Sequence, residues 1–302
     1  MAAPPTGTYQ TYTAIVNRED LIDLIVNISP TDTPVLSMTE SVRAYNTLHE
    51  WQTQALKTPA AVARVEGEDA NIKTITPTTR LNNYTQIIDN NFIVSNTQQA
   101  VRAAGRADED AYQTELAMKE LANDIEYAFV VNSASASGAS ATARQLKGLA
   151  GWVTTNQSTA TANRALTSTL LDALLKTVWL SGGRPDTILT GGTQKIAFTN
   201  TTNFPGMMRN ITATIGSYSL FVDVYQGGIG GSLKLITSTI MGNNLDNQIF
   251  TLQMDKFRKA WLRPIKKFPL GITGDGQKFQ IVAEVTLESL NEKASGVVKN
   301  LS

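Results

Sequence analysis

Few side chains in this sequence suit acid–base or metal chemistry. The chain has one histidine, His49, and no cysteine. Imidazole serves in general acid–base catalysis and in zinc binding, so any such role would fall to His49 alone. His49 lies beside Trp51 in the strand-like segment Thr47–Thr53, where a packed or edge-exposed histidine is the commoner role. We therefore expect no imidazole-dependent catalysis and no thiolate metal site.

Three acidic residues form a second group with chemical potential. Glu66, Glu68 and Asp69 lie in the run VEGEDA. They could bind a hard cation, but they lack the regular ligand spacing of an EF-hand loop. A solvated acidic tip or a contact between subunits is the favoured interpretation. Paired carboxylates for glycoside chemistry stay open as an alternative, because the separation of two carboxylates depends on the fold.

Two glycine-rich segments raise the question of phosphate binding. The first reads GTQK at Gly192–Lys195 and lacks the Gly-Lys-Ser/Thr order of a P-loop. The second, residues 227–231, leads into a strand rather than into a helix. No Gly-x-Ser-x-Gly motif is present. We expect turns at both segments, and no catalytic, cofactor-binding or metal-binding residue in the chain.

The composition indicates a soluble globular protein of one or two domains. Hydrophobic residues make up 42% of the 302 residues, and 26 basic residues balance 26 acidic ones. This balance gives no sign of a general nucleic-acid or membrane-surface binder. The first residues lack the pattern of a signal peptide, and no apolar stretch is long enough to span a membrane, so we expect function in a cytosol.

The longest helical pattern runs from Asp108 to Val131, roughly 36 Å at about 1.5 Å per residue. Its acidic start suits the positive end of the helix dipole. Apolar residues recur at three- and four-residue spacing along one stripe: Ala111, Met118, Leu121, Ala122, Ile125, Ala128 and Phe129. From this stripe we expect Met118, Leu121, Ile125 and Phe129 in the core.

Before this helix the sequence predicts an arm and a hairpin. A short helix capped by Asn17 and another beginning at Pro34 form the arm. The segments Thr47–Thr53 and Tyr84–Thr97 are strand-like and are joined by a polar stretch, which predicts a long β-hairpin. A two-stranded hairpin is marginal in water, so it must lie on another surface.

After the helix the pattern is that of an α/β module followed by long strands. Helices are predicted over Leu170–Val178 and around Ile196, and strands at Thr187–Thr190, Leu220–Tyr225 and Leu233–Thr237. In the closing strands, one set of residues is expected to face the core and the alternate set to face water. The inward set is Ile281, Ala283, Val285 and Leu287, and the outward set is Glu284, Thr286 and Glu288.

Several segments resemble the major capsid proteins of tailed bacteriophages, and the resemblance covers nearly the whole chain. The segments are NREDLIDLIVNISPTDTPVLS (17–37), TLHEWQTQAL (47–56), VEGEDA (65–70), TPTTRLNNYTQI (76–87), TQQAVRAAGRADEDAYQ (97–113), ARQLKGLAGWVTTN (143–156), MDKFRKAWLRP (254–264) and residues 274–301.

The resemblance implies an α+β capsid-shell fold, shared with encapsulin shells. Its expected parts are an N-terminal arm (1–46), an extended β-hairpin loop (47–98), a peripheral domain with the spine helix (99–151), an α/β axial domain (152–244), and closing strands of the peripheral domain (245–302).

It also implies a structural role without enzymatic activity. The protein would assemble through hexamers and pentamers into an icosahedral or prolate head around double-stranded DNA, bound non-specifically on the inner face. Expected partners are other copies of the chain, a scaffolding protein, a portal and, optionally, a decoration protein, with no cofactor and no membrane. Assembly is expected in the host cytoplasm and residence in the virion.

Contacts between subunits are expected at Glu66, Glu68, Asp69, Trp51 and Arg80. Basic partners for the acidic tip are expected among Arg43, Arg102, Arg106, Lys256, Arg258 and Lys259. The alternatives are the shell of a cellular encapsulin-like nanocompartment and, less favoured, a carbohydrate-active enzyme.

Overall fold

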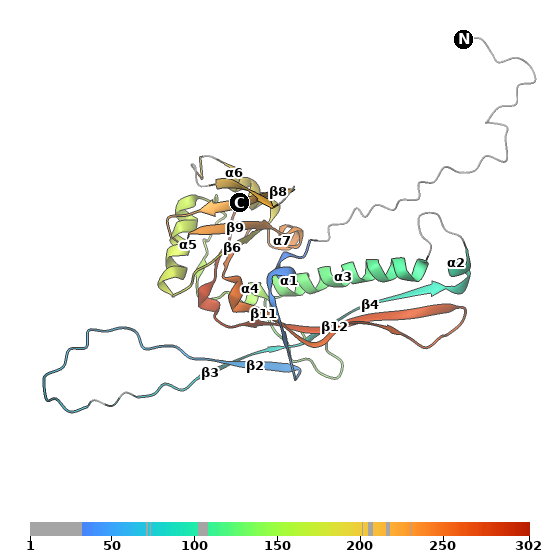
Figure 1. The fold of residues 1–302 in the computed structure, drawn as a ribbon, viewed down its shortest axis with the longest axis horizontal. Coiled ribbons are helices and arrows are strands. Elements are labelled where there is room, and N and C mark those ends of the chain that lie inside the picture. The colour runs from blue at the N-terminus through green and yellow to red at the C-terminus, as the bar shows by residue number, and fades with distance from the viewer. Residues whose placement is uncertain are drawn as a thin grey trace, which may run out of the picture.

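The computed structural model describes residues 32–302 except 71, 73, 102–107, 201, 205–207, 216, 217 and 230, with the backbone alone for the described part of 208–222. The helix expected after Asn17 lies outside these residues. Figure 1 shows a long helix on an elongated sheet, a mixed α/β part at one end, and a projecting hairpin.

The long helix, α3, spans Glu109–Val131 and begins where the sequence predicts. The carboxylate of Asp108 caps it by accepting hydrogen bonds from the backbone N–H groups of Asp110 at 3.0 Å and Ala111 at 3.4 Å. Leu121, Ile125 and Phe129 are fully buried. These side chains join one core cluster with residues of the sheet below.

Met118 departs from the expected core, because its side chain is 43% exposed. The C-terminal half of α3 is enclosed by α1 (Pro34–Met38), α4 (Leu149–Trp152) and α7 (Thr239–Asn244). The N-terminal half rests on the sheet without that cover (Figure 1). The stripe is therefore continuous in sequence, but only its second half is enclosed.

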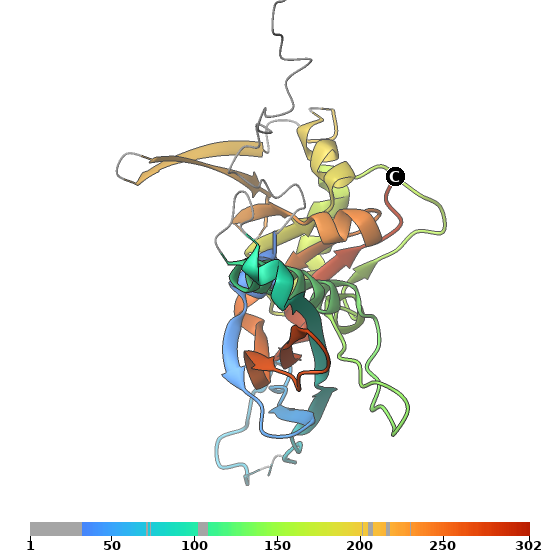
Figure 2. The same ribbon diagram turned by 90° about the vertical axis from the view of Figure 1, so that its right-hand side faces the viewer.

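The sheet beneath α3, which we call the long sheet, has the strand order β1-β11-β12-β4. Its strands are β1 (Glu40–Arg43), β11 (Phe257–Pro269), β12 (Gly276–Ser289) and β4 (Gln86–Ser95). β12 pairs antiparallel with both β11 and β4, and β1 pairs parallel with β11. Figure 2 shows α3 end-on, lying across one face of this sheet.

The outward set of β12 does not face water, contrary to the expectation. Glu284 is 4% exposed, Thr286 is fully buried and Glu288 is 7% exposed. The base of the hairpin covers this face, since the side chain of Asn83 donates a hydrogen bond to the carbonyl of Leu287. The middle of β12 is thus buried on both faces.

The hairpin itself is shorter than predicted. It consists of β2 (Leu48–Thr53) and β3 (Thr79–Tyr84), paired antiparallel. The segment expected as its second strand becomes β4 and short helix α2 (Asn96–Ala100) instead. Thr85, which is fully buried, turns the chain from one sheet to the other. Its N–H donates to the carbonyl of Thr47 at 2.8 Å, and its hydroxyl donates to Glu284.

The α/β part contains a second sheet, the mixed sheet, with the order β5-β13-β10-β6-β9-β8-β7. Its strands are Gln157–Ser158, Gly296–Val298, Ile249–Leu252, Thr187–Thr190, Ser232–Thr237, Tyr218–Gln226 and Met208–Ile215, in that order. Helices α5 (Ser168–Leu180) and α6 (Gly192–Thr199) belong to the same part (Figure 1).

Two strands of the mixed sheet come from the segment 245–302, which the resemblance assigned to the peripheral domain. β10 pairs with β6, placing Phe250 opposite Leu189, and β13 pairs with β10. Both strands are buried along their whole length and lie between β5 and β6 in the mixed sheet. The chain therefore returns to the mixed sheet twice after residue 244.

Replacing Leu121 with alanine tests the buried half of α3. Because the side chain is fully buried, Leu121→Ala should lower the free energy of unfolding by about 2–5 kcal/mol. Met118→Ala, on the same helix but 43% exposed, is the matched control and should lower it much less. Urea unfolding followed by circular dichroism measures both. Equal losses for the two variants would show that the two halves of α3 are equally enclosed.

Candidate inter-subunit surfaces

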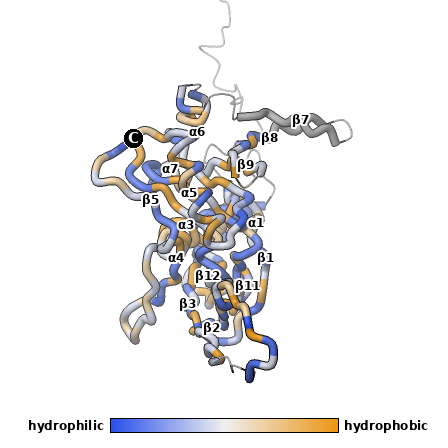
Figure 3. Tube along the Cα trace, turned by 90° about the vertical axis from the view of Figure 1, so that its left-hand side faces the viewer, coloured by the Kyte–Doolittle hydropathy of each residue, from blue (hydrophilic) through white to orange (hydrophobic). Residues whose placement is uncertain are grey.

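The distal hairpin loop, residues 54–78, carries apolar side chains without a core on its own chain. Its exposed members include Leu56, Val62, Val65, Ile72 and Ile75, with Leu56 94% exposed. The hydrogen bonds that the described residues of this loop make stay within the hairpin, such as Gln54 Nε2 to the carbonyl of Thr76 at 3.1 Å. Figure 3 shows hydrophobic and hydrophilic stretches alternating along the loop. Apolar side chains in such a projection are typical of a contact surface.

The acidic tip, Glu66, Glu68 and Asp69, lies at the end of this loop as expected. A turn at Gly67, with φ of +84°, brings the N–H of Glu68 to the carbonyl of Val65 at 3.1 Å. Glu68 is 3.7 Å from Arg64, and Asp69 accepts a hydrogen bond from the N–H of Ala70. Within the described part of the chain, Glu66 has no such partner. Its charge is therefore free for a neighbouring molecule.

The two other expected contact residues differ from each other. The side chain of Arg80 is 66% exposed and lies 3.6 Å from Glu50, so it is accessible to a partner. Trp51 is buried in its own chain, and its indole N–H donates to the carbonyl of Ser289 at 2.9 Å. Its ring also packs against Trp152, with 5.5 Å between ring centroids. This side chain therefore anchors the hairpin within its own chain, and the expected contact of Trp51 with a neighbouring copy stays a prediction.

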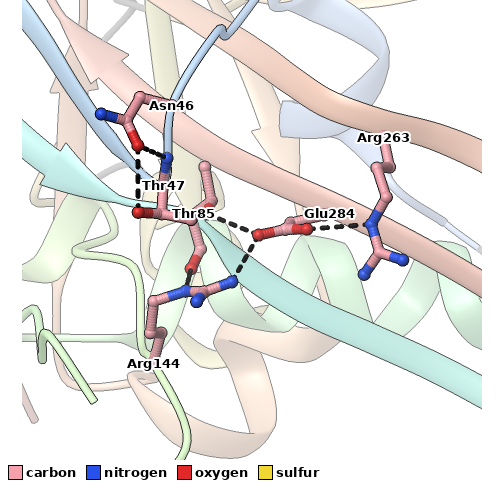
Figure 4. Close-up of polar contacts among 6 residues, drawn as sticks. All are labelled: Asn46, Thr47, Thr85, Arg144, Arg263 and Glu284. Carbon is pink, nitrogen blue, oxygen red and sulfur yellow. Dashed lines mark hydrogen bonds and ion pairs between the residues drawn. The ribbon is translucent and has the colours of Figure 1, made fainter. Parts of the chain in front are cut away.

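Glu284 organises the base of the hairpin (Figure 4). Its carboxylate lies 2.6 Å from Arg144 and 2.9 Å from Arg263, and it accepts the hydroxyl hydrogen bond of Thr85 at 2.8 Å. Burial acts to raise the pKa of Glu284, but the hydrogen bonds from Thr85, Arg263 and Arg144 outweigh it and leave the pKa below its ordinary value. The ionised carboxylate thus joins β12, β11, the crossing residue Thr85 and the loop after α3.

A second buried carboxylate, Glu126 of α3, holds the end of the arm. Its two oxygens accept hydrogen bonds from the N–H groups of Val35 at 3.0 Å and Leu36 at 2.7 Å, in the first turn of α1. Burial raises the pKa of Glu126 to about 7, with a further contribution from the negative charge of Asp32, although the two N–H groups act in the opposite direction. Docking of α1 therefore depends on a carboxylate whose charge is unfavourable to bury.

The basic residues expected to receive an acidic tip are mostly engaged within their own chain. Arg258 pairs with Glu40, Lys256 pairs with Asp255, and Lys259 donates to the carbonyl of Leu36. Arg43 lies over the ring of Tyr45. Arg102 and Arg106 fall outside the described residues. Lys266, further along β11, has no ion pair among the described residues.

Lys266 belongs to an exposed surface that the sequence analysis missed, which we call the open sheet face. It is the part of the long sheet opposite α3 that the hairpin base leaves uncovered. Register and strand alternation place Ile87, Ile93 and Phe268 there, 48%, 60% and 45% exposed. Arg263, about half exposed, and Lys266, which has no ion pair among the described residues, lie on the same face. The surface joins exposed apolar side chains to positive charge.

The described residues show no sign of metal chemistry. They contain no group of three or more His, Cys, Asp or Glu side chains placed to hold a metal ion. His49 lies 3.8 Å from Glu288 under the hairpin base and close to Trp51. None of the helices in the described ranges is long and apolar enough to cross a membrane.

Comparison with known proteins identifies the family. The sequence profile of the SU10 major capsid proteins matches residues 5–302. The chain belongs to this family. A curated relative, the major capsid protein of Escherichia phage Phieco32, is 38% identical over 100 residues, which is 33% of this chain and 28% of that relative. The match thus spans less than a third of that relative's length.

Solved structures share the fold of this SU10-family chain. The capsid of cyanophage A-1(L) has a TM-score of 0.68 at 15% identity, with 97% of this chain and 99% of that chain covered. The holo-SrpI encapsulin complex from Synechococcus elongatus has a TM-score of 0.65 at 14% identity, with 95% and 92% covered. The fold is therefore the α+β fold of tailed-phage capsid proteins, as the resemblance implied.

The ionisation of Glu126 should make stability depend on pH. Its pKa rises from the ordinary 4.5 to about 7 on folding, so the native state binds its proton more tightly than the unfolded chain. The resulting contribution, up to about 3 kcal/mol, is complete below pH 4.5 and is lost as the pH rises to 7. Glu126→Gln cannot titrate, so its free energy of unfolding should lack this decline.

Urea unfolding of the unassembled protein at pH 4.5, 6 and 7.5 measures the difference. Glu115→Gln, at an exposed position of the same helix, is the control and should keep the wild-type slope. If Glu126→Gln shows the same slope as the wild type, Glu126 is not the titrating group.

Proposed function

We propose that this protein is the major capsid protein of a tailed phage and assembles with copies of itself into the head that encloses the double-stranded genome. One observation carries this proposal beyond family membership. The distal hairpin loop projects apolar and acidic side chains that have no surface of their own chain to cover. A repeating shell supplies such a surface for every copy.

The second copy offers a matching surface in its open sheet face. Val62, Val65 and Ile72 of the loop are apolar and exposed, as are Ile87 and Phe268 of the sheet face. Burying these side chains against one another removes apolar area from water on both chains. We therefore place the distal hairpin loop of one copy on the open sheet face of the next.

Charge complementarity supports the same arrangement. Glu66 has no partner within the described part of its own chain, and Lys266 has no ion pair there. An exposed pair contributes only about 0–1 kcal/mol, but a shell repeats the contact in every subunit. Arg80 is accessible on the hairpin and would add a second contact.

The parts of the chain then take distinct roles. In this proposal residues 1–46 form the arm, 47–84 the extended hairpin, 85–151 with β11 and β12 the peripheral domain, and 152–253 with residues from 290 onward the axial domain. Hexamers and pentamers close the head, with DNA held non-specifically inside. Assembly in the host cytoplasm with a scaffolding protein, a portal and an optional decoration protein completes the proposal, and the role is structural rather than enzymatic.

A cellular nanocompartment shell is the second candidate function. The likeness of fold to the SrpI encapsulin favours it, at 14% sequence identity. Nuclease-protected DNA inside the particles separates the two functions, because a phage head packages its genome. The match to a phage capsid family over residues 5–302 favours the head.

Reversing the charge of the acidic tip tests the contact between copies. The triple variant Glu66→Lys, Glu68→Lys, Asp69→Lys should fold normally, because these side chains are exposed and belong to no core. Its particle yield should fall severalfold at low ionic strength, where charges are least screened. Lys266→Glu in the same chain should restore part of the yield.

A single charge reversal provides the matched control. Glu66→Lys should lower the particle yield, whereas Asp255→Lys, at an exposed position outside the proposed contact, should leave it unchanged. Sedimentation separates particles from free subunits, and circular dichroism checks the fold. Equal yields from wild type and the triple variant would remove the acidic tip from the contact.

A further inference from the structure

The direction in which the hairpin projects is set at its base. Beyond β2 and β3, the described residues of the loop bond only within the hairpin. Three side chains fix the base to the body by hydrogen bonds. Trp51 donates to the carbonyl of Ser289, and Asn83 donates to the carbonyls of Leu287 and Lys147. Thr85 donates to the carboxylate of Glu284. A small tilt at this interface moves the distant tip by a large amount.

One polar contact at this interface is incomplete. His49 of β2 lies directly opposite Asn83 and faces β12. Its Nε2 atom is 3.8 Å from a carboxylate oxygen of Glu288, which is too long for a hydrogen bond. Both side chains are largely buried, 16% and 9% exposed. Among the described residues, Nε2 has no hydrogen-bond partner, and neither has the hydroxyl of Thr286, two residues from Glu288.

A buried polar atom without a partner is unfavourable, and here a single proton changes the balance. A protonated imidazole carries an N–H at both ring nitrogens and a positive charge, so Nε2 can donate to the Glu288 carboxylate after a small closing movement. A neutral imidazole has no positive charge to attract the Glu288 carboxylate. Histidine is the side chain that ordinarily changes charge between pH 5 and 8, and His49 is the only one in the chain.

The other charged groups around the pair have partners of their own. Arg258 lies across from Glu288 on β11 and pairs with Glu40. Lys147, from the loop after α3, lies over the ring of Trp152 at 4.5 Å. On β2 itself, the adjacent Glu50 pairs with Arg80. Among the described residues, none of these three groups therefore provides a hydrogen-bond partner for the Nε2 atom of His49.

We propose that His49 is a positioning residue, which on protonation pairs with Glu288 and fixes the hairpin against β12. Mild acid closes this contact and holds the hairpin in one direction. Deprotonation loosens it and lets the hairpin tilt about Trp51 and Asn83. This inference rests on the proposed function, because the hairpin is the element offered to a neighbouring copy.

Hydrogen exchange on the purified, unassembled full-length chain tests the proposal. Exchange of the backbone amides in 48–53 and 79–84 is measured at pH 5.5 and pH 8 for wild type, His49→Gln and Glu288→Gln. Comparing variants at the same pH cancels the intrinsic effect of pH on exchange. In wild type, protection of these amides should be about tenfold greater at pH 5.5 than at pH 8, the size of effect expected for a charge-assisted hydrogen bond. In both variants the pH response of these amides should fall to that of the control amides at 249–252.

Two internal controls separate the contact from general effects. Amides of 249–252, in the buried centre of the mixed sheet, should respond alike in all three proteins. Amides of 34–38 report the titration of Glu126, which both variants keep. If His49→Gln lowers protection at 249–252 as well, its fold is disturbed, and Glu288→Gln decides the question.

The same pH response in wild type and Glu288→Gln, or no response in wild type, overturns the proposal. The exchange experiment does not require assembly. Either of these outcomes therefore leaves the proposed shell function standing if particles form. Failure to form particles would contradict the shell function while the exchange result still stands.

Discussion

The attachment of the hairpin base to β12 is the interaction on which the rest of the structure depends. A two-stranded hairpin is marginal alone, yet here β2 and β3 carry a long loop away from the body. The side chains of Trp51 and Asn83 donate hydrogen bonds to the backbone carbonyls of Ser289 and Leu287, so they tie the hairpin to the fully buried end of β12. This attachment turns a weak element into a directed projection.

Buried carboxylates reinforce the attachment at a cost in solvation. Glu284 is held ionised by two arginines and a hydroxyl, which compensate its burial. Glu126 has only backbone N–H partners for its two oxygens, and its pKa of about 7 reflects that weaker compensation. The charge of Glu284 is thus compensated by its partners, whereas the docking of the arm on α3 depends on the protonation of Glu126.

The sequence predicts elements whose signal is local. The spacing of Leu121 and Ile125 and the acidic start at Asp108 are enough to place α3. The exposure of Met118 depends on which elements enclose each half of the helix, and no local pattern contains that information. The burial of Glu284 on the outward side of β12 has the same origin, because the hairpin that covers it is distant in sequence. Thr85 belongs to no periodic pattern, so the sequence does not predict that the chain passes there from β3 in the hairpin to β4 in the long sheet.

Only part of the candidate contact surface could be predicted from the sequence, because the rest depends on which strands pair. An exposed acidic tip follows from composition alone, since Glu66, Glu68 and Asp69 flank a glycine. The open sheet face combines Ile87 from β4 with Lys266 and Phe268 from β11, and only the pairing of these strands with β12 brings them together. The anchoring role of Trp51 could not be predicted from the sequence. Its partner, the carbonyl of Ser289, is distant along the chain, and only the fold brings the two together.

Electron cryomicroscopy of particles from cells producing the protein tests the central claim most directly. The account predicts closed shells of hexamers and pentamers in which the distal hairpin loop of each copy lies on the open sheet face of its neighbour, against Ile87, Lys266 and Phe268. Particles whose hairpin loops contact no neighbouring chain, or a protein that stays monomeric at high concentration, would contradict it.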